Sequence, residues 1–558
     1  MSDAQNRLIY LPLGGAGEVG MNAYVYGYGR PGEERLLLVD LGVTFPNMDT
    51  TPGVDLILPD MTWLIERAER LEAIVVTHGH EDHIGGVAHY LADLDAPVLC
   101  RRFTGALMRR KLEEQGLSLE HLQIAEAWPE SLQVGPFELS FLPVSHSIPE
   151  SSGLVIDTPA GRVVHTGDFK LDGSPVVGEP FDPALWSSVA EPGLRALVCD
   201  STNIGVAHPG RSESTVGPKI AELVAGRREG MVIATTFASN VARVKTLAEA
   251  GIAAGRSVCL LGRAMQRMVQ VARETGVLPD FPQLVPAEQA AELPRENLML
   301  IVTGSQGERR AASAQLARGK YLGMELREGD LFLFSSKTIP GNERGVLDIV
   351  NALSEKGVDV IDDSTSDYHV SGHANRPDLE MLHELMHPQM LIPMHGEHRM
   401  LRGHALAARA RGIPSAIAPN GTMLDLTGPE PEVAGHVEAG RVYLDGPIKV
   451  GALDGVVRAR IRMALNGHVM LTLILDEADA MLGDPWAETM GLAETGRSNQ
   501  PLVEVIEAEA AQAMARADRR TRADDDKLDE MLRRVVRQTS VEEIGRKPEV
   551  TVVVSRLS

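Results

Sequence analysis

The sequence predicts an α/β protein of layered sheets and helices, with a second α/β region inserted into the first and a small α+β region at the carboxyl end. Three observations predict this fold. Short apolar runs alternate with helical patterns over the first 200 or so residues, and strands again alternate with helices after residue 231. The last stretch holds two charged helical patterns between two strand-like runs.

The first region is expected to form a sandwich with a site at the ends of its strands. The strands are predicted at 8–13, 36–41, 73–77, 138–143, 154–157, 162–166 and 196–200, and the helices at 61–69, 86–94 and 105–115. Several of these strands run directly into polar loops, and polar loops at strand ends are where α/β folds usually place their sites.

The inserted region alternates strands and helices, which favours parallel pairing. Strands are predicted at 231–235, 257–261, 298–302, 330–334 and 358–361, and helices at 240–253, 265–275 and 345–356. From 375 to 425 the pattern is helix, strand, helix, strand, with one strand at 390–394.

A passage rich in proline and glycine after Gly428 indicates a domain boundary. Beyond it we expect a strand at 468–476, helices at 502–520 and 524–537, and a final strand at 549–557. The chain of 558 residues exceeds what one hydrophobic core usually organises, so several domains are expected.

The composition is that of an ordinary globular protein. It also limits where in the cell the protein is expected and how it could bind nucleic acid. No apolar stretch is long enough to span a membrane, and the first residues lack the pattern of a signal peptide, so a cytoplasmic location is expected. The three cysteines are far apart, which suits a reducing compartment and buried packing. The net charge of −23 argues against general electrostatic binding of nucleic acid, so an acidic nuclease must neutralise phosphates locally, with metal ions and a few Arg or Lys residues.

The strongest chemical signal is the run His78-Gly79-His80-Glu81-Asp82-His83, directly after the strand expected at 73–77. Imidazole and carboxylate groups suit Zn²⁺ or Mn²⁺. A turn at a strand end can direct His78 and His80 to one ion while Asp82 and His83 face another. A lone histidine is usually an ordinary polar residue, but three histidines and an aspartate within six residues favour a metal site.

Further ligands follow other predicted strands: His146, Asp168 and His395. The first ion would then be held by His78, His80 and His146, the second by Asp82, His83 and His395, with Asp168 bridging them. Two cations suit phosphodiester hydrolysis, because they lower the pKa of a shared water and hold the phosphate oxygens. Asp82 is also placed to orient that water or to accept a proton from it.

These residues resemble the ligand pattern of the metallo-β-lactamase superfamily, over the chain up to about residue 450. The inserted region before His395 is similar to the β-CASP domain of nucleic-acid-processing members. Asp200-Ser201-Thr202-Asn203 resembles the acidic motif of that group, Ser371-Gly372-His373-Ala374 its histidine motif, and His395 its last motif. The resemblance implies an αββα sandwich at 1–215 and 373–455, a β-CASP domain at 216–372, a linker at 456–469 and a C-terminal α+β domain at 470–558.

Two segments narrow the resemblance to the ribonuclease J family. The substrate-binding residues implied are Phe237, Ala238, Ser239 and Asn240, which would hold a 5′-phosphate, and His369, Val370, Ser371, Gly372 and His373, which would line the path of the RNA phosphates. An alternative is that Ser239 and Asn240 only cap a helix. The loops at 303–308 and 339–343 also resemble this family. After Glu308, however, Arg309-Arg310 replaces the expected proline and apolar residue and adds two charges that could contact RNA.

In the family, Asp200 and His373 are candidates for proton transfer, and the sequence leaves open which is the acid and which the base. Histidine can take either role near neutral pH. An alternative role for Asp200 is to hold a ligand histidine in its correct tautomer.

The resemblance implies a metal-dependent ribonuclease that degrades RNA from a 5′-monophosphorylated end in the 5′-to-3′ direction, with endonuclease activity as a further mode. Two divalent ions are expected, Zn²⁺ first and Mn²⁺ or Mg²⁺ as alternatives. Other hypotheses are a DNA nuclease, a small-molecule hydrolase and a non-catalytic RNA-binding scaffold. We expect a homodimer or homotetramer formed through the C-terminal domain, and no membrane partner.

Overall fold

The computed structural model describes residues 6–365 and 367–557, which form two compact units. Unit 1 comprises the chain up to Thr44 together with Leu58–Gly440, and unit 2 comprises Phe45–Ile57 together with the chain from Arg441 onward. The linker and domain limits proposed from the sequence placed 441–455 with the sandwich, whereas this stretch groups with the C-terminal residues.

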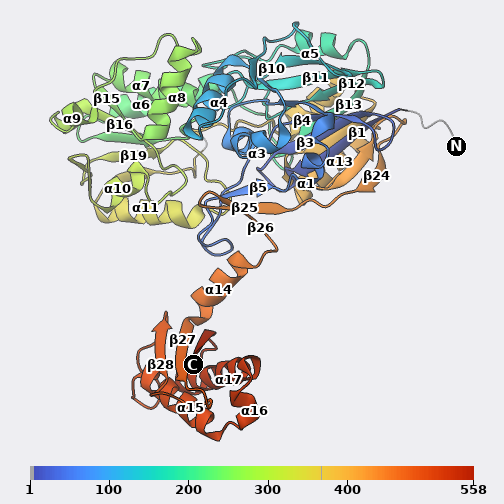
Figure 1. Ribbon diagram of the computed structural model, residues 1–558. Coiled ribbons are helices and arrows are strands. Elements are labelled where there is room, and N and C mark those ends of the chain that lie inside the picture. Colours follow the sequence, from blue (N-terminus) through green and yellow to red (C-terminus); the bar gives the residue numbers. More distant parts are fainter. Residues whose placement is uncertain (1–5, 366, 558) are drawn as a thin grey trace, which may run out of the picture. The chain divides into compact units, whose positions relative to one another are not determined.

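Unit 1 contains two mixed sheets that face each other (Figure 1). In order, the first sheet is β24 (Glu432–His436), β23 (Thr422–Asp425), β1 (Arg7–Gly14), β3 (Ala23–Gly29), β4 (Arg35–Val39), β6 (Leu71–Val75), β7 (Val98–Cys100) and β8 (Leu122–Ile124). The second is β21 (Met390–Met394), β13 (Leu194–Asp200), β12 (Gly161–His165), β11 (Ser152–Thr158), β10 (Phe137–Pro143) and β9 (Leu132–Val134).

The core of the sandwich lies between these sheets. Alternate residues of each strand point inward, so Tyr26 and Val39 of the first sheet join Phe141 and Ile392 of the second in one buried cluster. The other face of the second sheet is covered by α5 (Pro183–Ala190), α12 (Arg376–Met386) and α13 (His398–Ala410). The helices α3 (Val87–Leu94) and α4 (Arg102–Glu114) complete the layered architecture expected from the sequence.

The inserted region forms a five-stranded sheet in which every pair is parallel, as predicted. Its order is β15 (Ser257–Leu261), β16 (Leu298–Val302), β14 (Val232–Thr235), β19 (Leu331–Phe334) and β20 (Asp359–Ile361). In Figure 1, α7 (Val241–Ala253) and α8 (Arg263–Glu274) lie on one side of it, and α10 (Ala312–Arg318) and α11 (Glu343–Glu355) on the other. Helices on both faces explain why the strands are almost entirely apolar.

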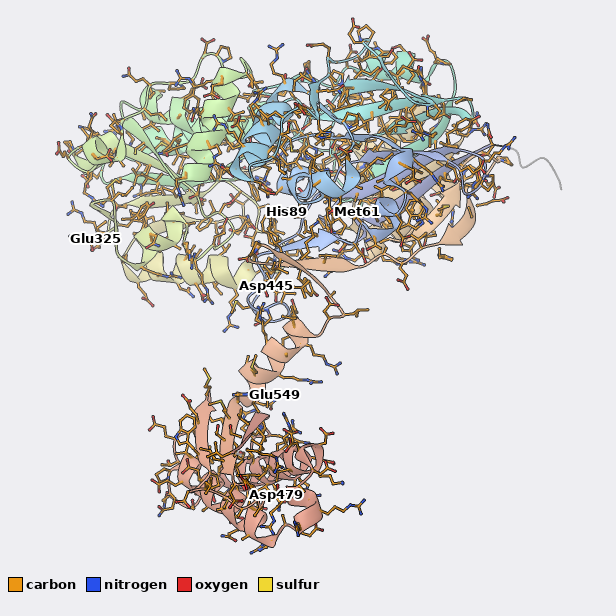
Figure 2. All side chains as sticks on the ribbon, viewed as in Figure 1. Met61, His89, Glu325, Asp445, Asp479 and Glu549 are labelled. Carbon is orange, nitrogen blue, oxygen red and sulfur yellow. The ribbon has the colours of Figure 1, made fainter. Side chains whose placement is uncertain are left out.

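Unit 2 has its own core. Its sheet has the order β28 (Trp486–Met490), β27 (His468–Leu475) and β29 (Glu549–Arg556), and α15 (Leu502–Arg516) and α17 (Asp525–Ile544) pack on one face. Among the side chains labelled in Figure 2, Asp479 pairs with Arg556 at the end of β29. The unit also contains β25 (Arg441–Asp445), β26 (Ile448–Gly451) and α14 (Val456–Asn466).

Several sequence predictions need correction. The helix expected at 61–69 is a four-residue helix, α1 (Thr62–Ile65), followed by a short 3₁₀ turn at Ala68–Arg70. The helix expected at 502–520 ends at Arg516, because Asp518 caps a new short helix, α16 (Arg519–Arg522). The expected linker 456–469 contains the helix α14, which leaves its prediction as a linker untested. Strand β28 was not predicted at all.

Among the described residues, no helix is both long and apolar enough to cross a membrane. The three cysteines are unpaired and buried, as expected. Burial raises the pKa of Cys100 to about 12 and that of Cys259 to about 11, so these thiols stay protonated and behave as small apolar side chains.

Candidate metal centre

The predicted ligands converge at one end of the sandwich, where strands of both sheets finish. His78 and His80 follow β6, and the short helix α2 (Glu81–Ile84) carries Asp82 and His83. Three further residues arrive from the second sheet: His146 after β10, Asp168 after β12 and His395 after β21. Strand ends that lie far apart in the sequence therefore bring all seven side chains together.

The side chains form two groups that share one carboxylate. The first group contains His78, His80, His146 and Asp168, and the second contains Asp82, His83, Asp168 and His395. Within each group the candidate ligand atoms all lie within 4.8 Å of one another. These are the two sets that the sequence predicted, with Asp168 in the bridging position.

Asp168 is buried and faces histidines of both groups. Its Oδ2 lies 3.8 Å from Nε2 of His78, 3.8 Å from Nε2 of His146 and 3.3 Å from Nε2 of His83. Its Oδ1 contacts Nδ1 of His395. One buried carboxylate thus lies between the two groups, where the sequence predicts a bridging ligand.

Three of the histidines are held through Nδ1, which leaves Nε2 facing the centre, and Nε2 of His83 also lies 3.0 Å from the side-chain amide of Asn22. His146 donates from Nδ1 to the carbonyl of Gly372 at 2.6 Å, and His83 donates to Oδ2 of Asp40 at 2.7 Å. Nδ1 of His78 lies 3.0 Å from the hydroxyl of Thr77. Such outer partners fix the ring orientation and the tautomer of metal-binding histidines.

The sequence reading missed Asp40 and Asn22. Asp40 is fully buried just after β4 and also accepts bonds from the amide and hydroxyl of Thr77, so one carboxylate orients both the loop and His83. Asn22 is buried and donates to the carbonyl of Asp82 at 3.0 Å. A carboxylate directly after an apolar strand was the only available signal for Asp40, and nothing in the sequence marked Asn22.

The donor set fits divalent cations. Nε2 of His395 is buried and has no hydrogen-bond partner among the described residues, although it lies 3.7 Å from Oδ2 of Asp82. A buried ring nitrogen without a partner is costly unless a ligand takes its lone pair. Neutral imidazoles and carboxylates together supply the nitrogen and oxygen donors that first-row metals bind. These clusters therefore suggest divalent metal binding.

The two groups differ in their electrostatics. Burial lowers the pKa of His80 to about 4 and those of His78 and His146 well below the usual value. Burial acts in the same direction on His83 and His395, but the nearby carboxylates, Asp168 first among them, outweigh it and raise both pKa values. The first group thus favours neutral imidazoles at neutral pH, and the second balances its histidines against carboxylates.

Asp200 and His373 form a hydrogen-bonded pair at the edge of this centre. Oδ2 of Asp200 accepts from Nδ1 of His373 at 2.7 Å, while its Oδ1 accepts from the amide of Thr202 at 2.8 Å. His373 is 22% exposed, so it reaches the open side of the site. Burial lowers its pKa, but the charge of Asp200 outweighs this and raises it to about 9. Asp200 therefore holds His373, and together with Asp168 these two side chains form a third group whose candidate ligand atoms lie within 4.8 Å of one another.

Neighbouring residues of the segment 237–240 have different contacts. Asn240 caps α7, because its Oδ1 accepts from the amide of Arg243 at 3.0 Å. Ser239 turns the other way, and its hydroxyl lies 3.1 Å from Nε2 of His80. Phe237 and Ala238 are half-buried in the turn between β14 and α7. The capping interpretation thus describes Asn240, whereas Ser239 adjoins the metal centre.

The segment 369–373 wraps around the same centre. Ser371 accepts from the side-chain amide of Asn203 at 2.8 Å, and Gly372 supplies the carbonyl that holds His146. A Cβ on Gly372 would lie 2.8 Å from the ring of His146, so only glycine allows this approach. Val370 is buried and His369 is half-buried, and burial followed by the charge of Arg243 lowers the pKa of His369 to about 3.

Comparisons with known families agree with this architecture. Residues 16–226 match the metallo-beta-lactamase superfamily and residues 229–353 the ribonuclease J beta-CASP domain. Residues 357–419 match the Zn-dependent metallo-hydrolase RNA specificity domain, and residues 455–557 the ribonuclease J C-terminal domain. The fold and the paired ligand groups define a metallo-hydrolase of the metallo-β-lactamase superfamily with a β-CASP insertion.

Individual relatives narrow this class. The chain is 40% identical to ribonuclease J of Sinorhizobium meliloti over 553 residues, covering 99% of this chain and 97% of the relative. It is 38% identical to ribonuclease J of Mycolicibacterium smegmatis, covering 97% and 96% respectively. A solved structure of a protein of unknown function from Enterococcus faecalis V583 shares the fold, with a TM-score of 0.53 at 16% identity over 75% of this chain and 100% of that chain. The chain belongs to the ribonuclease J family and is a metal-dependent, RNA-processing ribonuclease.

Proposed function

We propose that the chain is a two-metal 5′-to-3′ exoribonuclease that prefers 5′-monophosphate ends and also makes internal cuts. The observation that carries this proposal is the contact between Ser239 and His80, at 3.1 Å. It places the start of α7 against the first ligand group. A phosphate bound there would lie beside the bond that is cleaved.

The start of α7 has the chemistry to bind a terminal phosphate. The first backbone N–H groups of a helix are not used within the helix, and they attract anions. At the start of α7, the Asn240 side chain occupies the amide of Arg243, and the carbonyl of Ser239 occupies the amide of Val241 at 2.9 Å. A triphosphate would place further negative charge in a turn built of Phe237, Ala238 and Ser239, two of which are apolar. A monophosphate is therefore the better fit.

We propose two divalent ions, one for each ligand group, with Zn²⁺ as the first choice and Mn²⁺ or Mg²⁺ as alternatives. Bound there, such ions would lower the pKa of a shared water and neutralise the phosphate. The histidines favour Zn²⁺ or Mn²⁺, since imidazole suits these ions better than it suits Mg²⁺.

The remaining chemistry falls to three side chains. Asp82 is the most open carboxylate of the ligand groups, with 29% of its side chain exposed, so it can orient the attacking water and accept a proton. His373 is held through Nδ1 by Asp200, which leaves Nε2 to donate a proton to the leaving 3′-oxygen. Asp200 acts as a positioning residue in this scheme.

The test uses one RNA prepared with either a 5′-monophosphate or a 5′-triphosphate and labelled at its 3′ end. We expect rapid decay of the monophosphorylated RNA, slow decay of the triphosphorylated one, and no decay with the His80→Ala variant. Ser239→Ala should reduce the preference between the two ends. Ser214→Ala, at an exposed serine that bonds only to other serines, should leave it unchanged.

Other outcomes would change the proposal. Equal cleavage of both RNAs into internal fragments would remove the end preference and keep the nuclease. Faster cleavage of DNA of the same sequence would replace RNA as the substrate. The absence of any cleavage across Zn²⁺, Mn²⁺ and Mg²⁺ would contradict the catalytic proposal as a whole.

We also propose that the chain forms a homodimer or homotetramer in the cytoplasm, associated through its C-terminal domain. The support is the uncovered face of the sheet of unit 2, where Ile474, Trp486 and Met490 are 42%, 52% and 66% exposed. Thr472 pairs with Trp486, and His468 with Met490, so these side chains share one face of the sheet. An apolar patch of this kind usually marks an interface.

Light scattering tests the association. Trp486→Glu should lower the mass at micromolar concentration, and so should deletion of 470–558. Leu322→Glu is a matched control, because this residue of unit 1 is 53% exposed. A wild-type monomer would contradict the proposal.

A further inference from the structure

Three loops leave the same edge of the inserted sheet at the same level. Thr235 of β14 pairs with Val302 of β16 on one side and with Phe334 of β19 on the other. The strands are parallel, so the loop 236–240 has the loop 303–311 and the loop 335–342 as its two neighbours. Ser239 of the middle loop contacts His80, so the two flanking loops lie on either side of a loop that reaches the candidate metal centre.

The two flanking loops are joined to each other by specific contacts. The side chain of Gln306 donates to the carbonyl of Lys337 at 2.9 Å and accepts from the amide of Ile339 at 2.8 Å. Gly307 packs so tightly on Gly345 that a Cβ at Gly307 would lie 2.3 Å from the Gly345 backbone. These contacts bring the segment that follows Gly307 beside the start of α11.

This joined surface carries three uncompensated cations, which we call the rim arginines: Arg309, Arg310 and Arg344. All three are exposed, and within the described residues none has an ion-pair partner. The acids of the same loops are turned to the backbone instead. Glu308 accepts from the amide of Gln306 at 2.9 Å, and Glu343 from the amide of Gly341 at 2.7 Å.

The rim arginines lie on a chain whose net charge is −23. Exposed cations without an ion-pair partner contribute to a local positive potential, and such a potential attracts a polyanion. Guanidinium groups also match the geometry of phosphate oxygens.

We propose that the rim arginines form a sequence-independent contact surface for the RNA backbone next to the catalytic centre. The surface holds single-stranded RNA beyond the nucleotides that occupy the centre itself. It adds a local electrostatic attraction on a chain that is acidic overall. The inference rests on the proposed function only in placing RNA along the 236–240 loop.

The experiment compares two double variants with the same loss of charge. Arg309→Gln/Arg310→Gln removes two rim arginines. Arg228→Gln/Arg327→Gln removes two exposed arginines that precede β14 and β19, and so lie at the opposite edge of the same sheet. Binding of a labelled 5′-hydroxyl oligouridine of about 20 nucleotides is measured by anisotropy in the His80→Ala background, across a range of KCl concentrations.

Each phosphate contact with single-stranded nucleic acid contributes about 0.7 to the slope of log K against log salt. The rim double variant should therefore reduce this slope by about 1.4, and adding Arg344→Gln should reduce it by about 0.7 more. The opposite-edge variant should leave the slope unchanged. Equal slopes for the two double variants, or an unchanged slope in the rim variant, would overturn the proposal.

A cleavage assay separates this inference from the proposed function. With His80 restored, the rim double variant should cleave a 5′-monophosphorylated dinucleotide at the wild-type rate, which also shows that it is folded. Its kcat/KM on a long RNA should fall several-fold at low salt. Normal cleavage of long RNA at low salt would contradict the contact surface and leave the exonuclease intact. If the wild-type protein does not cleave the dinucleotide, the proposed function is contradicted. The salt dependence of oligouridine binding would still test the contact surface.

Discussion

The two ligand groups use the same kinds of side chain under opposite electrostatic conditions. In the first group, burial among other histidines lowers the pKa values of His78, His80 and His146. In the second, carboxylates raise those of His83 and His395. The same type of side chain can therefore have a lowered pKa in one ligand group and a raised pKa in the other. One group offers neutral rings, and the other offers negative charge balanced by protons that a cation would displace.

The substitution with the largest expected effect is Asp168→Asn, because Asp168 belongs to both groups. We expect a loss of more than about 100-fold in kcat/KM, beyond what outer partners of a metal site usually cost. Metal analysis should show less of both ions, whereas His146→Ala or His395→Ala should mainly reduce one. Asp157→Asn, at a surface partner of Arg162, serves as the control. A normal metal content in Asp168→Asn would contradict the bridging role.

The second test weakens one group only. Asp40→Asn retains the shape but removes the charge that orients His83, so the affinity for metal at the second group should fall about 10- to 100-fold. Competition with a chelator should then show one weakened and one normal ion. If both ions weaken equally, the two groups are not independent, and the comparison fails.

The third test acts on the first group through the backbone. In Gly372→Ala, the new Cβ would meet the ring of His146 at 2.8 Å and the hydroxyl of Ser147 at 3.0 Å, which displaces a first-group ligand. We expect roughly a tenfold loss of activity, near the lower limit for disturbed outer partners. Gly173→Ala, where a Cβ meets nothing within 4 Å, should be neutral.

The smallest expected effect is on how the folding stability of the metal-free protein changes with pH. The folded pKa of His80 is about 4, below its unfolded value near 6.5, so this residue costs stability as pH falls from 6.5 toward 4. His395 has a raised folded pKa, so its contribution is complete below 6.5 and is lost as pH rises above it.

Denaturant unfolding at several pH values measures both contributions. His80→Gln should flatten the acidic side of the stability curve, and His395→Gln the alkaline side. The same change on both sides for both variants would show that the two groups share one electrostatic environment.

Site residues could be predicted where the residues that indicate them lie close together in the sequence or directly follow a strand. The run from His78 to His83 lies on one turn, and His146, Asp168 and His395 each follow an apolar strand, so the ligand sets could be assembled from the sequence. Asp40 could not be assigned, because its partner His83 lies 43 residues away and an aspartate after a strand resembles any turn residue.

The fold shows the same limit. The parallel sheet of the inserted region could be predicted, because its strands are buried on both faces and read as continuous apolar runs. Strand β28 could not, since it alternates exposed residues with few buried ones and depends on β27 for its pairing. Ser239 and Asn240 are neighbours with different roles, and only tertiary contacts distinguish them.

The spacing of the ligands along the chain also matters while the protein is being made. Asp168 meets His395 across 227 residues, so the ribosome needs roughly 10 to 45 s, at 5–20 residues per second, to add the last ligand after the bridging one. During that time the nascent chain holds most of its ligands but cannot close the second group. The second ligand group can therefore form only after most of the messenger RNA has been translated.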